Sequence, residues 1–300
     1  MTGAALANVL LEGRRLRPLW RALLFFGLGS WVLMPLADRG TNAVLRTLHV
    51  DPNGLTAAAT FASEFELLII ALALTALFAR YERRRVDSYG LPIAEAFRGR
   101  FWEGLVVGTV SAALIAGGML ALGGMRIDGL ALHGERLALA TLAWLVTNVC
   151  VGLAEEMWYR GYLLQTLWKS IGFWPAATVL TLLFTSDHFF FKTGENLADV
   201  IALVLFGMMT CYSVLRTGTL WFAVGYHAAF DFMQLFVIGT RNGSAVPVDH
   251  LLDTSFPGPA WLTGGQLGTE ASWLTYPLLA LAFAYLYVRT RGTAKRSSLS

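Results

Sequence analysis

Long runs of apolar residues, separated by short polar segments, extend through most of the chain. About 20 apolar residues are enough for an α-helix to cross the hydrocarbon core of a bilayer. The pattern predicts about eight such helices, near residues 19–37, 55–79, 101–122, 137–167, 173–191, 197–215, 220–239 and 273–288. We therefore expect an all-α fold: a polytopic membrane protein in which residues 1–300 form a single integral-membrane domain.

Composition agrees with a membrane protein and argues against the common soluble classes. Hydrophobic residues make up 56% of the chain and charged residues only 14%, which is far from the balance of a soluble domain. Cys150 and Cys211 both lie in apolar segments, so we expect two small buried side chains rather than a disulfide or a metal site. No stretch alternates basic and aromatic residues, and we expect no nucleic-acid partner.

Basic residues are concentrated in alternate polar segments. If the N-terminus is cytoplasmic, the inner side collects most of them: Arg14, Arg15 and Arg17, the arginines between residues 80 and 100, and Arg289, Arg291, Lys295 and Arg296. The positive-inside rule then predicts that both termini are cytoplasmic. A composition rich in Ala, Gly, Leu and Arg suggests a bacterium, in which this multi-pass protein would lie in the inner (plasma) membrane.

The predicted helix at residues 137–167 carries three charged side chains, Glu155, Glu156 and Arg160. Each such group costs roughly 2.5–3.5 kcal/mol at the centre of a bilayer, so the three together need an explanation. Glu156 and Arg160 are four residues apart and are expected to form a structural ion pair on one face of the helix. Glu155 points about 100° away and remains available for chemistry. The alternative is a polar contact between helices.

Three more polar residues fall at a similar depth on other helices. At 1.5 Å per residue, Glu155 and His188 each lie roughly 20 Å from the inner end of their predicted helix. His227 and Asp231 lie roughly 16 and 22 Å from the inner end of theirs. We expect these four side chains to converge, although a local hydrogen bond could satisfy each of them separately.

A group of this kind suits peptide hydrolysis, which needs a positioned water, a base, donors for the oxyanion and an acid for the leaving amine. Glu155 fits the base and later the acid, His188 could hold the same water, and His227 could donate to the oxyanion. The rival is zinc held by His188, His227 and Asp231, with Glu155 as base. No HExxH motif supports it, so no cofactor is expected, although zinc remains possible.

Other features of the sequence have weaker interpretations. Glu64 and Glu66, early in the second predicted helix, are expected at the level of the lipid headgroups, and the alternative is a functional role. Gly104 and Gly108 have the small-xxx-small spacing that permits close contact between helices. The Gly- and Pro-rich segment at residues 240–272 is expected to be a solvated or lid-forming loop.

Three motifs in this order resemble a known family: Glu155-Glu156-x-x-x-Arg160, Phe184-x-x-x-His188 and His227-x-x-x-Asp231. They are similar to those of the CPBP (CAAX protease and bacteriocin-processing) intramembrane proteases, which are related to the type II CAAX prenyl endopeptidases. The resemblance covers roughly residues 137–237. It implies an eight-helix glutamic endopeptidase, formerly classed as a metalloprotease, with a cavity open toward the membrane. The residues matching Glu155 and His188 would activate water, and those matching His227 and Asp231 would form the oxyanion side.

One position departs from the common pattern of that family, since Asp231 stands where an asparagine is frequent. An ionised carboxylate would repel an oxyanion, so Asp231 is protonated, orients His227 or ligates a metal. The expected partners are the lipid bilayer and a membrane-associated peptide or protein substrate, while the oligomeric state is left open. The alternatives to a glutamate-dependent endopeptidase are a zinc-dependent variant, a non-catalytic scaffold or immunity protein and, less well supported, a proton-coupled transporter.

Overall fold

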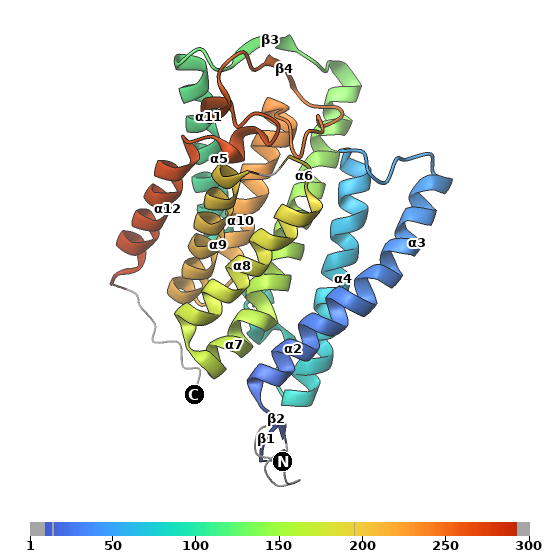
Figure 1. Cartoon of the computed structure of the whole chain (residues 1–300), viewed down its shortest axis with the longest axis vertical. Coiled ribbons are helices and arrows are strands. Elements are labelled where there is room, and N and C mark those ends of the chain that lie inside the picture. The colour runs from blue at the N-terminus through green and yellow to red at the C-terminus, as the bar shows by residue number, and fades with distance from the viewer. Residues whose placement is uncertain (1–9, 14, 195, 293–300) are drawn as a thin grey trace.

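The computed structural model describes residues 10–13, 15–194 and 196–292, and it is a bundle of helices (Figure 1). The basic residues Arg14, Lys295 and Arg296 lie outside the described residues. Within the described part, six helices are long and apolar enough to cross a membrane: Pro18–Thr47, Ala57–Glu82, Gly99–Ala121, Gly134–Ile171, Leu197–Thr217 and Trp221–Ile238. The all-α class and a polytopic membrane arrangement therefore agree with the structure.

Two further predicted spans are helices but are not among these six. Helix α8 covers Phe173–Phe191, as expected, and its apolar sequence is interrupted by Asp187 and His188. Helix α12 covers Thr275–Thr290 and has only 16 residues. The count of eight spans thus stays a prediction.

The first helix is longer than the sequence predicted. It consists of α2 (Pro18–Leu28), a π-helical segment η1 (Gly29–Leu33) and α3 (Met34–Thr47). The predicted end of this helix at residue 37 is wrong, because Asp38 and the following polar residues continue it to Thr47. Pro35 does not end it, since a proline is tolerated in the first turn of α3 after the π segment.

The remaining elements follow the predicted order with shifted ends. They are α4 (Ala57–Glu82), η2 (Val86–Tyr89), η3 (Ile93–Glu95), α5 (Gly99–Ala121), α6 (Gly134–Glu156), η4 (Met157–Leu163), α7 (Leu164–Ile171), α9 (Leu197–Thr217), α10 (Trp221–Asp231) and η5 (Phe232–Ile238). Segments η4 and η5 are π-helical and follow α6 and α10 without a break.

Two short antiparallel strand pairs lie at opposite ends of the bundle (Figure 1). Strands β1 (Leu11–Glu12) and β2 (Arg15–Leu16) pair at one end. At the other end, β3 (Arg126–Leu130) pairs with β4 (Leu252–Ser255), followed by α11 (Ala260–Thr263) and η6 (Gly268–Ala271). The segment at residues 240–272 therefore has structure of its own and covers this end of the bundle.

Helices α5 and α10 touch backbone to backbone through glycines. A Cβ atom at Gly104 would lie 2.1 Å from the carbonyl oxygen of Phe222, and one at Gly108 would lie 2.4 Å from that of Tyr226. From the other side, a Cβ atom at Gly225 would lie 2.1 Å from the carbonyl oxygen of Phe101. The small-xxx-small spacing thus marks a real close approach, and it fixes the helix that carries His227.

Replacing Gly108 with leucine should destabilise the protein, because no rearrangement short of separating α5 from α10 removes the clash. We expect a loss of about 1–3 kcal/mol in the free energy of unfolding, measured as a lower melting temperature in detergent. The control is Gly117→Leu on the same helix, where an added Cβ atom meets nothing within 4 Å. Equal melting of the two variants would contradict the close approach.

Candidate active site

Both acidic residues of the central motif lie at the end of α6, where the helix changes its winding. The π-helical segment η4 starts directly after Glu156, and Gly161 within it has non-helical backbone angles (φ −74°, ψ −111°). Isolated π segments are frequent at functional sites because they shift the following side chains around the helix axis. Here the segment contains Arg160, whose guanidinium reaches back to Glu156.

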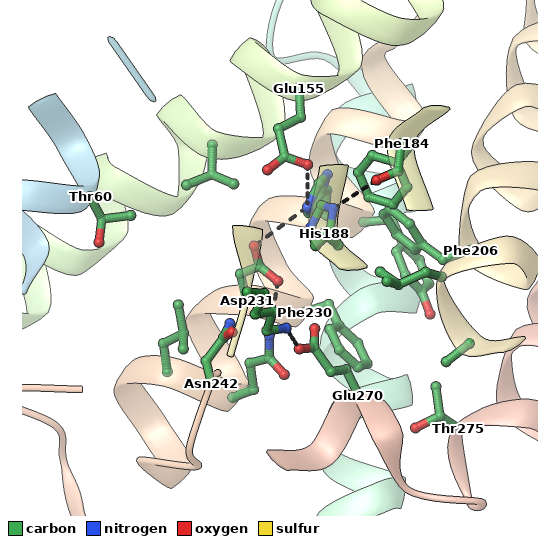
Figure 2. Close-up of a pocket in the computed structure, with 18 of the residues that line it drawn as sticks. Thr60, Glu155, Phe184, His188, Phe206, Phe230, Asp231, Asn242, Glu270 and Thr275 are labelled. Atoms are coloured by element: carbon green, nitrogen blue, oxygen red, sulfur yellow. Dashed lines mark hydrogen bonds and ion pairs between the residues drawn. The ribbon is translucent and has the colours of Figure 1, made fainter. Parts of the chain in front are cut away.

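A cavity of about 230 Å³ is lined by all four side chains predicted to converge: Glu155, His188, His227 and Asp231. They come from three elements, α6, α8 and α10. Figure 2 shows Glu155, His188 and Asp231 around the same space. Since one water molecule occupies about 30 Å³ in the liquid, the cavity has room for several waters.

A backbone contact fixes the hydrogen position on His188. Its Nδ1 lies 3.0 Å from the carbonyl oxygen of Phe184, one helical turn earlier (Figure 2). A carbonyl oxygen can only accept, so Nδ1 must donate and carry the hydrogen. In the neutral ring Nε2 is then a hydrogen-bond acceptor, which is the form needed to hold a water molecule.

His227 is surrounded by three carboxylates. Its Nδ1 lies 3.1 Å from Oε1 of Glu156, a hydrogen bond in which the ring donates. Its Nε2 lies 3.7 Å from Oε2 of Glu155 and 3.5 Å from Oδ2 of Asp231. Those two distances are too long for hydrogen bonds, so Nε2 faces the space between Glu155 and Asp231.

Glu156 therefore has a second contact besides the predicted ion pair. Its Oε1 lies 3.5 Å from Nη1 of Arg160, and both side chains are 0% exposed. The guanidinium carbon of Arg160 also lies 4.7 Å from the centre of the Phe184 ring, in a cation–π contact. The sequence prediction divided the two glutamates into a structural and a chemical one. That division is too simple, because Glu156 also orients His227.

Asp231 is held by an amide whose orientation is fixed. Nε2 of Gln234 donates to Oδ1 of Asp231 at 3.2 Å, and Oε1 of Gln234 accepts from the hydroxyl of Thr269 at 2.9 Å. One oxygen of Asp231 thus accepts from Gln234 while the other faces His227. Among the described residues, no group of three or more His, Cys, Asp or Glu side chains is arranged to hold a metal ion.

Residues 137–233 match the family described as type II CAAX prenyl endopeptidase Rce1-like. This segment is an Rce1-like domain. The resemblance predicted from the three motifs is therefore confirmed, and the matched segment contains every predicted site residue: Glu155, Glu156, Arg160, His188, His227 and Asp231. A domain of this family implies a protease with a peptide or protein substrate. A comparison with curated proteins finds no significant match.

Glu64 lies outside the Rce1-like domain and does not occupy the level expected from the sequence. It was expected at headgroup level but lines the cavity together with Glu155. The reason is that the helices start at different heights. The hydroxyl of Thr147 donates to the carbonyl oxygen of Ala57, the first residue of α4, at 3.0 Å. Thr147 is already 13 residues into α6, so the start of α6 lies about 20 Å further toward the β3–β4 end of the bundle than the start of α4. A residue near the start of α4 is therefore level with the middle of the bundle.

The rim of the cavity contains an ion pair that the sequence did not reveal. Lys192, directly after α8, pairs with Glu270 in η6, and both residues line the cavity. Because the two residues are far apart in sequence, only the folded chain shows that they meet. The pair ties the segment at residues 240–272 to the Rce1-like domain at its site.

A larger hollow of about 640 Å³ adjoins the cavity. The two share Glu64, Glu155, His188 and Lys192. The larger hollow lies between the first helix, α4 and α8, and its walls include Trp31 and Phe191, which are 77% and 87% exposed. A chain lying in this hollow would therefore meet the carboxylate of Glu155.

Proposed function

We propose that the protein is an intramembrane endopeptidase that hydrolyses a peptide bond of a membrane-associated peptide or protein through a water activated by Glu155. The observation that supports it is the shared cavity, which brings Glu155, His188, His227 and Asp231 together inside an Rce1-like domain.

In the first step, a water molecule lies between the carboxylate of Glu155 and Nε2 of His188. Glu155 takes one proton of the water while His188 accepts a hydrogen bond from the other. The water oxygen forms a bond to the carbonyl carbon of the substrate, and the carbonyl oxygen becomes an oxyanion. The contact of His188 with Phe184 supports this role, because it leaves Nε2 as an acceptor.

In the second step, the bond between the carbonyl carbon and the amide nitrogen breaks. Glu155 returns its proton to the leaving nitrogen, so protons and electrons balance. With Nδ1 bonded to Glu156, His227 donates to the oxyanion from Nε2 as an imidazolium, whose charge the surrounding carboxylates compensate. Asp231 lies beside this ring and contributes to compensating its charge.

The test is a cleavage screen with purified protein in liposomes against membrane-anchored peptides, with products identified by mass spectrometry. We expect defined products from the wild-type protein and none from His188→Ala at equal protein amounts and equal melting temperature. Complete absence of products across the screen, from a protein that folds, would favour the scaffold or immunity role instead.

A further prediction concerns zinc, which His188, His227 and Asp231 would have to hold. A glutamate mechanism needs no metal, so exhaustive chelation should leave the cleavage rate within about twofold of the untreated rate. Loss of a catalytic metal would raise the activation free energy, and every 1.4 kcal/mol or so lowers the rate about tenfold. Metal content is measured on the same sample by mass spectrometry. Loss of cleavage on chelation, restored by zinc alone, would replace the glutamate mechanism with the metal-dependent one.

We further propose eight membrane spans, including α8 and α12, in a bacterial inner membrane with both termini cytoplasmic. The excess of basic residues on one side supports this orientation. In Figure 1, α4 ends and α5 begins at the end of the bundle where α2 starts, so the arginines between residues 80 and 100 share that side. A reporter fused after residue 292 that proves to be periplasmic would contradict it.

A further inference from the structure

Glu64 lies level with Glu155 on a parallel neighbouring helix. The contact between Thr147 and Ala57 sets the register of α6 and α4, which run in the same direction (Figure 1). Glu64 follows Ala57 by seven residues and Glu155 follows Thr147 by eight, so both lie about 11 Å beyond that contact. Both also line the cavity and the adjoining hollow, which makes Glu64 part of the same site.

The carboxylate of Glu64 forms no close ion pair among the described residues, and His227, on the same cavity wall, contacts Glu156 instead. Its Oε2 is inaccessible and has no hydrogen-bond partner there. The nearby cations already have carboxylates of their own: Arg160 contacts Glu156, and Lys192 pairs with Glu270. Of the other acids on the cavity wall, Glu270 is paired with Lys192, whereas Glu155 and Asp231 add charges of the same sign as Glu64. Glu64 is only partly buried, but a carboxylate oxygen shielded from water among like charges is costly unless a cation compensates it.

We propose that Glu64 determines substrate specificity by binding the cationic side chain of a lysine or arginine next to the scissile bond. The inference rests on the proposed endopeptidase function and names the substrate class. An ammonium or guanidinium group would form a charge-assisted hydrogen bond with Glu64 and offset the excess of carboxylates. Because Glu64 and Glu155 line the same two spaces, the bound side chain belongs to a residue within one or two positions of the cleaved bond.

A side chain fits this position better than a free N-terminus. The hollow continues past Glu64 along α4, where Ser63, Glu66 and Leu67 also line it. A substrate chain can therefore run beyond Glu64 instead of ending there. The cation that faces Glu64 could be a substrate side chain or a free N-terminus. N-acetylated peptides distinguish the two, because acetylation removes the charge of the N-terminus.

The experiment compares membrane-anchored, N-acetylated peptides that differ only in Lys or Gln at each position flanking the cleaved bond. We expect wild-type kcat/KM to favour Lys at one position by on the order of tenfold. Glu64→Gln should lose this preference, so that the two peptides are cleaved at equal rates. The control Glu135→Gln should keep it, because Glu135 is exposed near the start of α6 and lines neither the cavity nor the adjoining hollow.

Binding to Glu155→Gln gives a readout that does not need cleavage. The Lys peptide should bind this variant on the order of tenfold more tightly than the Gln peptide, and the difference should vanish in Glu155→Gln/Glu64→Gln. Equal treatment of Lys and Gln by the wild type, a preference that survives in Glu64→Gln, or a preference seen only with free N-termini would overturn the proposal. Cleavage of neutral peptides would leave the endopeptidase function standing in each case.

Discussion

Replacing Glu155 with glutamine is expected to abolish measurable cleavage while leaving the fold intact. Glutamine keeps the shape of the side chain but cannot take a proton from water. Removing a general base typically costs a factor of about 10² to 10⁴ in rate, and here the same group also protonates the leaving amine. The measurement is kcat on a membrane-anchored peptide, with the melting temperature recorded on the same sample.

The matched control for this variant is Glu135→Gln, which makes the same change on the same helix. Glu135 is exposed near the start of α6, far from the cavity. The Glu135→Gln variant should cleave the peptide at the wild-type rate and melt at the wild-type temperature. If Glu155→Gln keeps more than a tenth of the wild-type rate, Glu155 is not the base, and the hydrolytic role of the cavity needs another group.

Replacing Arg160 with leucine is expected to lower the free energy of unfolding by about 3–5 kcal/mol, the cost of removing one partner of a buried ion pair. The change leaves Glu156, which is 0% exposed, without its guanidinium. Cleavage should fall as well, since Glu156 also holds Nδ1 of His227. The measurement is the melting temperature or denaturant midpoint in detergent, together with the yield of folded protein.

Arg136→Leu is the control for Arg160, because it also breaks an ion pair made from α6. Arg136 pairs with Asp249 at 2.5 Å, but its side chain is 71% exposed, and exposed pairs contribute only about 0–1 kcal/mol. We expect little change in melting for this variant. An Arg160→Leu protein that expresses and melts like the wild type would show that the pair with Glu156 has no structural role.

Sequence patterns predicted the helices well where each span ended at a clear polar or glycine boundary. Helix α8 occupies the predicted residues, and α9 begins at the predicted Leu197. The sequence patterns failed for the first helix. It continues as α3 to Thr47, because Pro35 falls in the first turn after a π segment. They also missed the pairing of β3 with β4, since strands of five and four residues far apart in sequence leave no periodic signal.

The site was predictable to the extent that depth along a helix decides which side chains meet. Glu155, His188, His227 and Asp231 come together as counting from the inner helix ends suggested. Glu64 was not counted in this way: it was expected at headgroup level because it lies early in its helix, and the register of α4 against α6 is visible only in the folded chain. The hydrogen bond between Glu156 and His227 was missed for another reason: spacing within one helix reveals Arg160 as a partner but not a ring from α10.

The central claim is that one water molecule is held between Glu155 and His188 in a metal-free cavity. An experimental structure of the protein in lipid, at a resolution that shows ordered water and with data collected at the zinc absorption edge, tests it most directly. The account predicts a water within hydrogen-bonding distance of both the Glu155 carboxylate and Nε2 of His188, without an anomalous peak. A zinc ion bound by His188, His227 and Asp231, or apolar packing between Glu155 and His188, would contradict it.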